Sequence, residues 1–316
     1  MGADWPNEPD EPSDDTPDHQ DGRSAGGRAV PAETRSRQEY YVQLRQTVSA
    51  EQSATARRNA AEEQAQAEKW DKAAEESRLM WGEYQRRWPP DERPPVDNSA
   101  DPPGSWRADG DRFLPTAVNK RVDAECKRVE GREQDLISPA MRAVEGQDPD
   151  RHLIGFDDRR KGRDRIKEKV YLTIKQSNRS PEDAVSVVQD AIRYTFQYRE
   201  SSYTQSVQAD IGRLKDQGFE LHKLRNSWSD EQYKGINSQW TEPDTGQRFE
   251  VQFHTRISFE AKQLTHGAYE RLRTKQADKF EELVLEAFQG KVAALVPIPP
   301  SVDSITDYSK RGRDAR

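Results

Sequence analysis

Apolar and polar residues alternate strictly along the stretch FEVQFHT, residues 249–255. Successive side chains of an extended strand point to opposite faces. The stretch therefore places three apolar residues on one face and three polar residues on the other: Phe249, Val251 and Phe253 against Glu250, Gln252 and His254. The apolar face predicts a half-buried strand, and the polar face, with its carboxylate, amide and imidazole, is a candidate for function.

The same reasoning predicts a series of strands and helices after residue 112. Alternation predicts strands at 190–198, 219–225, 233–240 and 248–255, the last two joined by the turn TEPDTGQ. Apolar residues at helical spacing predict one helix and the start of another within 117–144, and further helices at 163–176, 180–189, 203–218 and 257–289. This order favours an α+β fold, with a mixed sheet flanked by helices, over a doubly wound parallel sheet.

The first third of the chain has a different character. Residues 1–37 are acidic, rich in Pro and Gly and poor in aliphatic side chains, so we expect a disordered tail. Residues 38–88 are rich in Ala, Gln, Glu and Arg and predict a long helix; no heptad stripe persists along it, which favours a solvated helix, with a docking or delivery element as the alternative. Three Pro-Pro pairs predict a stiff linker at 89–111. The globular domain would then cover 112–290, followed by a C-terminal tail at 291–316.

Composition limits the classes of function. Hydrophobic residues make up 32% of the chain and charged residues 34%, so not all of it can form a core. The net charge of -7 argues against a general nucleic-acid binder, but residues 151–180 hold ten Lys or Arg against four acids, a local balance of +6. That island suggests a phosphate-bearing partner, with a solvated charged surface as the alternative.

Cysteine usage and hydropathy exclude other classes. Cys126 is the only cysteine, which excludes an internal disulfide and a cysteine-based zinc site. No apolar run approaches the roughly 20 residues that a membrane span needs, and the acidic N-terminus is unlike a secretory signal. We therefore expect no membrane partner, and a cytoplasmic protein or one exported without a signal peptide.

Charged residues near the predicted strands suggest a chemistry. Asp190 opens one strand and Glu250 lies in another, and two carboxylates on neighbouring strands would suit Mg²⁺. A cationic set precedes them: Arg159, Arg160, Lys161, Arg163, Arg165, Lys167 and Lys169. Cations on one side and two carboxylates opposite are what a metal-assisted phosphoryl or pyrophosphoryl transfer needs.

Each of these residues also has a structural interpretation when it is taken alone. Glu250 would be a solvated strand residue and Asp190 a cap or turn residue. Tyr233 would be a core aromatic rather than a residue that stacks on a base. His266 shares a helix face with Tyr269 and would be a packing histidine. The functional interpretation rests on their joint occurrence in order along the chain.

Five segments over residues 113–287 resemble, in the same order, the synthetase domain of the RelA/SpoT-type alarmone synthetases, in particular its small and toxin-like members. They are LIGFDDRRKGRDRIKEKV, DAIRYT, LHKLRNSWSDEQYKGIN, FEVQFHT and THGAYE. The resemblance implies a nucleotidyltransferase-like fold with a mixed, mainly antiparallel sheet of about five strands. The sequence departs from the family's pattern at four matched positions: Arg165 for Ser, Thr195 for Arg, with Arg193 two residues earlier, Asn237 for His, and His254 for Arg.

The resemblance implies a role for each matched residue. Asp190 and Glu250 would hold Mg²⁺ and act in catalysis, and Glu250 would activate or orient the attacking hydroxyl of the acceptor. The residues implied in ATP binding are Arg159, Lys161, Arg165, Lys169 and Gln252. The acceptor base would stack on Tyr233, and the acceptor phosphates would contact Lys223, Arg225, Asn237 and His266. The acceptor choice would differ where His254 replaces Arg.

The implied function is ATP-dependent transfer of pyrophosphate to the 3′-hydroxyl of a purine nucleotide, either GDP or GTP, or ADP or ATP. The disordered arm and helical stalk favour a toxin, which would add an antitoxin or delivery partner bound by the 38–88 helix. One alternative acceptor is the 3′ end of tRNA, although the acidic balance favours a free nucleotide. The alternative from another class is a catalytically inactive nucleotide-binding or assembly protein.

Overall fold

The structure is a computed structural model that describes residues 32–89, 96–109, 111–146, 148, 150–274 and 277–310. Residues 1–31 of the tail predicted at 1–37 lie outside the described residues. The long helix α1 (Ala32–Arg87) begins at residue 32, so the predicted tail is wrong for residues 32–37, which are helical. By its contacts the chain divides into residues 1–57 and residues 58–316. The fold described below is that of residues 58–316.

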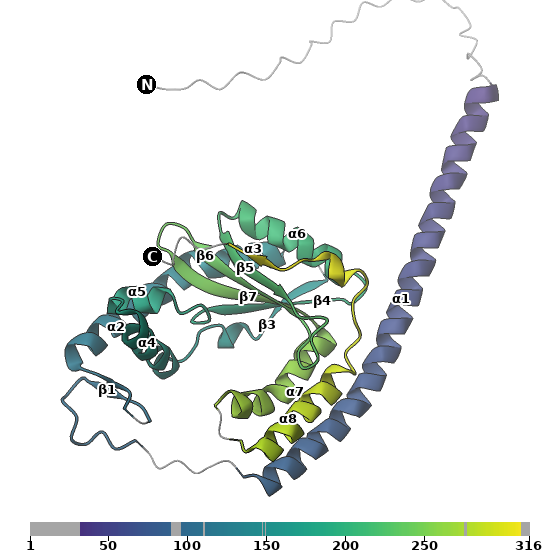
Figure 1. Ribbon diagram of the computed structural model, residues 1–316. Coiled ribbons are helices and arrows are strands. Elements are labelled where there is room, and N and C mark those ends of the chain that lie inside the picture. Colours follow the sequence, from purple (N-terminus) through teal and green to yellow (C-terminus); the bar gives the residue numbers. More distant parts are fainter. Residues whose placement is uncertain are drawn as a thin grey trace, which may run out of the picture. The chain divides into compact units, whose positions relative to one another are not determined.

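A mixed sheet of six strands forms the centre of this unit (Figure 1). In chain order the strands are β3 (Arg151–Ile154), β4 (Arg193–Tyr198), β5 (Glu220–Asn226), β6 (Ile236–Glu242), β7 (Gln247–Thr255) and β8 (Tyr308–Ser309). Their spatial order is β3-β4-β7-β6-β5-β8, and only β4 and β7 pair in parallel. The predicted α+β class with a mixed, mainly antiparallel sheet is confirmed, with six strands in place of about five.

The two strands at the edges of the sheet were not predicted. β3 has only four residues, RHLI, and half of them are Arg and His, so it lacks an alternating apolar signal. Arg151 is nevertheless fully buried, because Asp210 of α6 pairs with its guanidinium. β8 has two residues and pairs with β5 at Lys223 and Leu224. Such short edge strands are defined by tertiary pairing rather than by local sequence.

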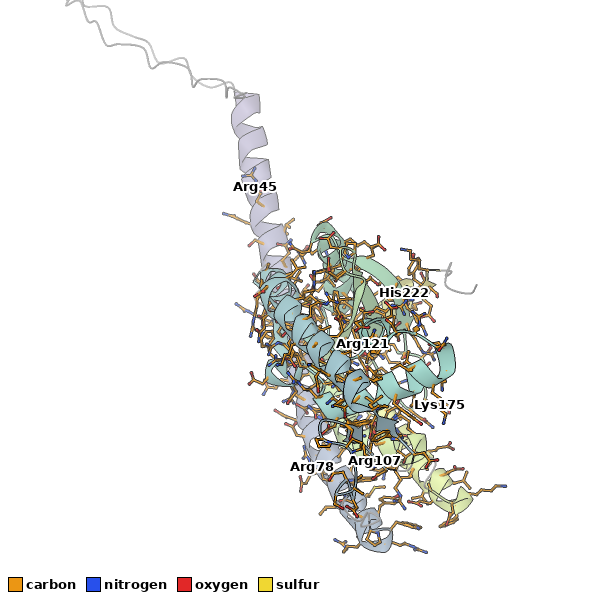
Figure 2. The ribbon with its side chains drawn as sticks, turned by 90° about the vertical axis from the view of Figure 1, so that its left-hand side faces the viewer. Arg45, Arg78, Arg107, Arg121, Lys175 and His222 are labelled. Carbon is orange, nitrogen blue, oxygen red and sulfur yellow. The ribbon has the colours of Figure 1, made fainter. Side chains whose placement is uncertain are left out.

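Helices cover both sides of the sheet. They are α2 (Thr116–Arg132), α3 (Ser138–Glu145), α4 (Arg163–Ser177), α5 (Pro181–Ser186), α6 (Tyr203–Asp216), α7 (Arg256–Arg273) and α8 (Lys279–Ala293). Figure 1 shows α3 and α6 on one side and α7 and α8 on the other, with α2, α4 and α5 grouped beside the sheet. Arg121 of α2 and Lys175 of α4, labelled in Figure 2, mark that group. None of the described helices has the length and apolarity to cross a membrane.

Short elements complete the connections. A π-helical turn, η1 (Glu133–Ile137), joins α2 to α3, and 3₁₀ turns lie at η2 (Phe156–Asp158) and η3 (Val302–Ser304). Strands β1 (Trp106–Arg107) and β2 (Phe113–Leu114) pair as a separate two-stranded sheet that straddles the predicted end of the linker.

The single helix predicted at 257–289 is wrong, because the chain forms two helices there. α7 ends at Arg273, and α8 starts after Asp278, whose side chain caps it by accepting a hydrogen bond from the backbone N–H of Glu281 at 2.8 Å. The break allows α8 to pack against α7, where Arg271 pairs with Glu281. A helical pattern on both sides of the break does not reveal it.

The predicted alternation of β7 is confirmed. Phe249, Val251 and Phe253 are each 0% exposed and belong to the core, where Tyr203 of α6 donates a hydrogen bond to the carbonyl of Phe253 at 2.8 Å. The opposite face of β7 is free of aliphatic residues and carries the polar side chains. The sheet therefore has one face in the core and one face available for a site.

The second part of α1 packs on α7 and α8, so the solvated-helix interpretation is wrong for that part. Trp70 is buried and donates a hydrogen bond from Nε1 to Oε2 of Glu260 at 2.6 Å. A Cβ on Gly267 of α7 would lie 2.6 Å from the ring of Trp81, so glycine is required for this approach. Side chains at 45–58 are exposed, as a solvated helix would have them.

Candidate functional site

A cavity of about 1880 Å³ lies on the polar face of the sheet. Strand pairing builds its floor: Arg193 of β4 is the register partner of Glu250 of β7, and Thr195 is the partner of Gln252. On the other side of β7, Asn237 of β6 is also in register with Gln252. Side chains in register on adjacent strands project to the same face, so these residues converge. Helices α4 and α7 and the loop before β6 supply the walls.

The first carboxylate of the cavity, Asp190, precedes β4 and is held by two lysines. Lys169 of α4 donates to both its oxygens, at 2.6 and 2.7 Å, and Lys161 lies 3.0 Å from Oδ2. Burial alone would raise the pKa of Asp190, but the hydrogen bonds and charges of Lys169 and Lys161 outweigh it and hold the pKa below its usual value. Asp190 is therefore a fixed anion at neutral pH.

The second carboxylate, Glu250, has no cation within ion-pair distance among the described residues. Its Oε1 accepts a hydrogen bond from the amide of Gln252, whose own oxygen accepts one from Lys262 of α7. Burial raises the pKa of Glu250; the Gln252 hydrogen bond and the charge of Arg193 work in the opposite direction without reversing the shift. Glu250 is therefore better suited than Asp190 to accept a proton.

A hydrogen-bonded chain fixes Tyr233 at the cavity wall. The Tyr233 hydroxyl lies 2.9 Å from Oδ1 of Asn237 and 3.0 Å from Nε2 of His254, and Nδ1 of His254 lies 2.9 Å from Oγ of Ser258. His254 is fully buried, and burial lowers its pKa well below the usual value, so it is neutral. A neutral histidine bonded at both nitrogens positions Tyr233; it is not exposed for contact with an acceptor.

The glycine of YKGIN, Gly235, leaves no room for a side chain at this wall of the cavity. Gly235 has φ 151, and a Cβ there would lie 2.6 Å from Cε1 of His254 and 3.2 Å from the Tyr233 hydroxyl. Any other residue would displace the histidine that holds Tyr233. Lys234 ties the loop by donating to the carbonyls of Trp228 and Asp230 at 2.9 and 2.6 Å.

Further charged side chains stand around the cavity. Arg165 of α4 pairs with Glu168 at 3.5 Å, and Arg273 of α7 pairs with Glu270 at 2.6 Å. His266, one turn before Glu270, also lines the cavity and is exposed. Surface pairs of this kind are weak, so a phosphate group can compete for these cations.

The structure brings together nine of the twelve residues proposed from the sequence: Asp190, Glu250, Lys161, Arg165, Lys169, Gln252, Tyr233, Asn237 and His266. It does not bring three others to the cavity. Arg159 pairs with the buried Glu133 of η1 at 2.7 Å, and Arg225 pairs with Asp230 at 2.9 Å. Lys223 is exposed on β5, opposite β8.

Sequence reasoning missed Lys262 and gave Arg193 no role, although both line the cavity. Lys262 lies 12 residues after Glu250, and its place depends on how α7 crosses the sheet, which has no local signal. For Arg193 a signal existed, because it and Thr195 are two residues apart on the same face of a strand. A position shift of two residues therefore keeps a side chain on the cavity side.

The carboxylates of the cavity fit the magnesium ion that the sequence suggests. Mg²⁺ prefers carboxylate oxygens and is usually held by one or two carboxylates, with water and substrate phosphates completing the shell. Asp190 and Glu250 both line the cavity and fit that donor set. Over the described ranges no group of three or more His, Cys, Asp or Glu side chains is placed to hold a metal ion. An ion here would depend on phosphate oxygens.

The fold and cavity together define a class: an α+β protein with paired carboxylates and clustered cations, suited to a phosphorylated ligand. No family model matches the chain, and no curated protein sequence matches it. Among solved structures, the small alarmone synthetase 1 from Bacillus subtilis is similar, with 12% identity and a TM-score of 0.37 over 56% of this chain and 91% of that one. The same enzyme bound to its product pppGpp matches with 14% identity and a TM-score of 0.31, over 43% of this chain and 70% of that one.

A third structure with similarity is a GTP pyrophosphokinase family protein from Streptococcus pneumoniae, with 13% identity and a TM-score of 0.37 over 58% of this chain and 90% of that one. All three similarities are at low identity and cover part of this chain.

Proposed function

We propose that the chain transfers the pyrophosphate group of ATP to the 3′-hydroxyl of a purine nucleotide. The observation that supports the proposal is the convergence of nine predicted residues, from helix α4, strands β6 and β7, helix α7 and three connecting segments, on a single cavity. Cations that bind phosphate, a carboxylate that can take a proton and an aromatic ring that can stack on a base are the groups that this reaction needs.

The donor side of the reaction is assigned to α4 and the segment before it. Lys161, Arg165 and Lys169 carry positive charge into the cavity beside Asp190. They would bind the phosphate chain of ATP and neutralise the charge that builds up on it. Mg²⁺, when bound by the carboxylates of Asp190 and Glu250, would supply further neutralisation of the phosphates.

The acceptor side is assigned to Tyr233, Asn237 and Glu250. The acceptor base would stack on the ring of Tyr233, which His254 and Asn237 hold in place. Glu250 would take the proton of the acceptor's 3′-hydroxyl while the oxygen of that hydroxyl forms a bond to the β-phosphorus of ATP. The bond from that phosphorus to the α,β-bridging oxygen breaks, its electron pair stays on the oxygen, and AMP leaves.

The test is to incubate the purified chain with γ-labelled ATP, Mg²⁺ and one acceptor at a time, from GDP, GTP, ADP, ATP and bulk tRNA. The proposal expects label on one purine nucleotide together with stoichiometric AMP. Label on tRNA alone would assign the alternative acceptor. Release of AMP or labelled phosphate with no labelled acceptor would contradict pyrophosphate transfer.

One observation favours a second function, nucleotide binding without transfer. Both oxygens of Asp190 accept hydrogen bonds from Lys169, so this carboxylate is already neutralised without a metal ion. A binding protein would show tight association with ATP or the acceptor by calorimetry and no labelled product in the assay above.

A toxin role would follow from transfer inside a cell, where ATP is consumed and a modified nucleotide accumulates. Expression of the chain in bacteria is expected to arrest growth, and the Glu250→Gln variant, expressed to the same level, is expected not to. Equal arrest by both proteins would separate toxicity from the transfer reaction.

A further inference from the structure

Two cations that line the cavity near Glu250 have no role in the proposed function. Lys262 lies on α7, two turns from its start, and its ammonium donates a hydrogen bond to the amide oxygen of Gln252. Arg193 opens β4 beside Glu250, its register partner on β7. Both side chains line the cavity, and they come from other elements than the α4 cations such as Arg165.

These two cations differ from the others around the cavity in what balances their charge. Lys161 and Lys169 pair with Asp190, Arg165 with Glu168 and Arg273 with Glu270. Over the described part of the chain, neither Lys262 nor Arg193 has an acidic oxygen within ion-pair distance. The ammonium of Lys262 contacts a neutral amide and lies 5.4 Å from the centre of the Phe259 ring.

Unbalanced cations in a partly buried place cost free energy unless a ligand supplies the counter-charge. Burial, together with the positive charge of Arg193, lowers the pKa of Lys262 to about 8, although the negative charge of Glu250 acts in the opposite direction. Their arrangement is typical of a site that binds an anion with more than one negative charge.

We propose that Lys262 and Arg193 form a phosphate subsite beside Glu250, separate from the cations held by Asp190. The ligand class is a di- or triphosphate chain, and its identity as substrate rests on the proposed function. Gln252 links the subsite to the reaction, because its amide contacts both Lys262 and Glu250. A phosphate bound there would lie next to the carboxylate assigned to take the proton.

The test measures anion binding directly, without turnover. Calorimetry with tripolyphosphate is carried out on the full chain and on Lys262→Met, Lys262→Arg and Arg193→Met. Lys262→Met and Arg193→Met are expected to weaken binding at least about tenfold each, as the loss of one charge-assisted hydrogen bond does. Lys262→Arg is expected to stay within about threefold. Lys215→Met, an exposed lysine of α6 outside the cavity lining, is the matched control and should bind like the unaltered chain.

Two further ligands identify the source of the phosphates. The same variants are titrated with ATP and with the acceptor found in the transfer assay, and the ligand whose affinity falls with Lys262→Met occupies the subsite. Thermal unfolding checks the fold; Lys262→Met should melt no lower than the unaltered chain, because it removes a cation that has no counter-charge.

Failure of the subsite and failure of the proposed function give different results. Transfer activity with unchanged tripolyphosphate binding in Lys262→Met would overturn the subsite and leave the function standing. Lys262-dependent binding of tripolyphosphate by a chain that transfers nothing would support the subsite and contradict the function. A folded chain that binds no tripolyphosphate would overturn the subsite as well.

Discussion

The two carboxylates of the cavity, Asp190 before β4 and Glu250 on β7, have surroundings that shift their pKa values in opposite directions. Asp190 accepts direct hydrogen bonds from Lys169 and an ion pair from Lys161, and its pKa lies below its usual value. Glu250 is bonded to a neutral amide, and burial raises its pKa. Two acids whose environments push their pKa values apart are a recurrent arrangement for division of labour in a site.

The difference shows how the fold assigns roles to equivalent groups. The lysines come from α4 and the segment before it, and they contact Asp190 ahead of the start of β4. On β7, the cation that α7 supplies, Lys262, contacts Gln252 instead of Glu250. One carboxylate is thus fixed as an anion, and the other remains able to change its protonation state.

The largest expected effect is on turnover. Glu250→Gln is expected to lower turnover at least about a hundredfold, because it removes the group that takes the proton. Asp190→Asn is expected to lower turnover by a similar factor, because it removes charge that organises the phosphates and the metal ion. Turnover is measured with labelled ATP at saturating substrate. Normal activity in either variant would remove that residue from the proposed mechanism.

The pH dependence of turnover separates the two roles. Loss of a proton acceptor leaves a residual rate that no longer rises as pH increases through the pKa of Glu250, whereas Asp190→Asn should keep that rise. Identical pH profiles for both variants would show that the two carboxylates share one role.

An intermediate effect is expected for the lysines that hold Asp190. Lys161→Met and Lys169→Met should each raise the KM for ATP about tenfold, the loss of one charged hydrogen bond to phosphate. Because either lysine alone still pairs with Asp190, each single variant should keep the fold. The double variant should lose more ATP affinity and more thermal stability than the two single variants together. Steady-state kinetics and thermal unfolding measure both. Lys175→Met on the same helix, outside the cavity lining, is the control. An unchanged KM in both single variants would remove these lysines from ATP binding.

The comparison also marks what the sequence could and could not predict. The polar face of β7 was predictable, because a period of two places Glu250 and Gln252 together whatever surrounds the strand. Asp190 was predicted as the first residue of a strand, and it lies three residues before β4. The partners that set their different pKa values were less accessible, since Lys262 reaches Gln252 only through the path of α7 across the sheet.

Arg159 and His254 also show that a sequence pattern does not reveal tertiary partners. Arg159 lies in a basic segment with a local net charge that suggests phosphate binding, but Glu133, 26 residues earlier in a π-helical turn, takes its guanidinium. His254 alternates correctly onto the polar face and is still fully buried, because α7 begins directly after β7 and covers it. Alternation predicts the face of a side chain and not what lies against it.

The smallest expected effect, on stability, is also the sharpest test of the comparison. A raised pKa means that the ionised form of Glu250 is disfavoured in the folded state, so its cost appears as pH rises above the unfolded value of about 4.3. Glu250→Gln should therefore melt about 2–4 °C higher at pH 8, the shift that roughly 1 kcal/mol produces in a domain of this size, and like the unaltered chain near pH 4.

Asp190→Asn should shift stability in the opposite direction. A lowered pKa contributes stability above the unfolded value of about 3.9, and this contribution is lost as pH falls through the folded value. The variant should melt about 2–4 °C lower at pH 7, with a difference that shrinks as the pH falls below 4. Asp216→Asn, on exposed surface outside the cavity lining, controls for the general loss of one negative charge. Melting-temperature shifts of the same sign for Glu250→Gln and Asp190→Asn at pH 7 would mean that the fold shifts the pKa values of both carboxylates in the same direction. That result would contradict the separation of their roles.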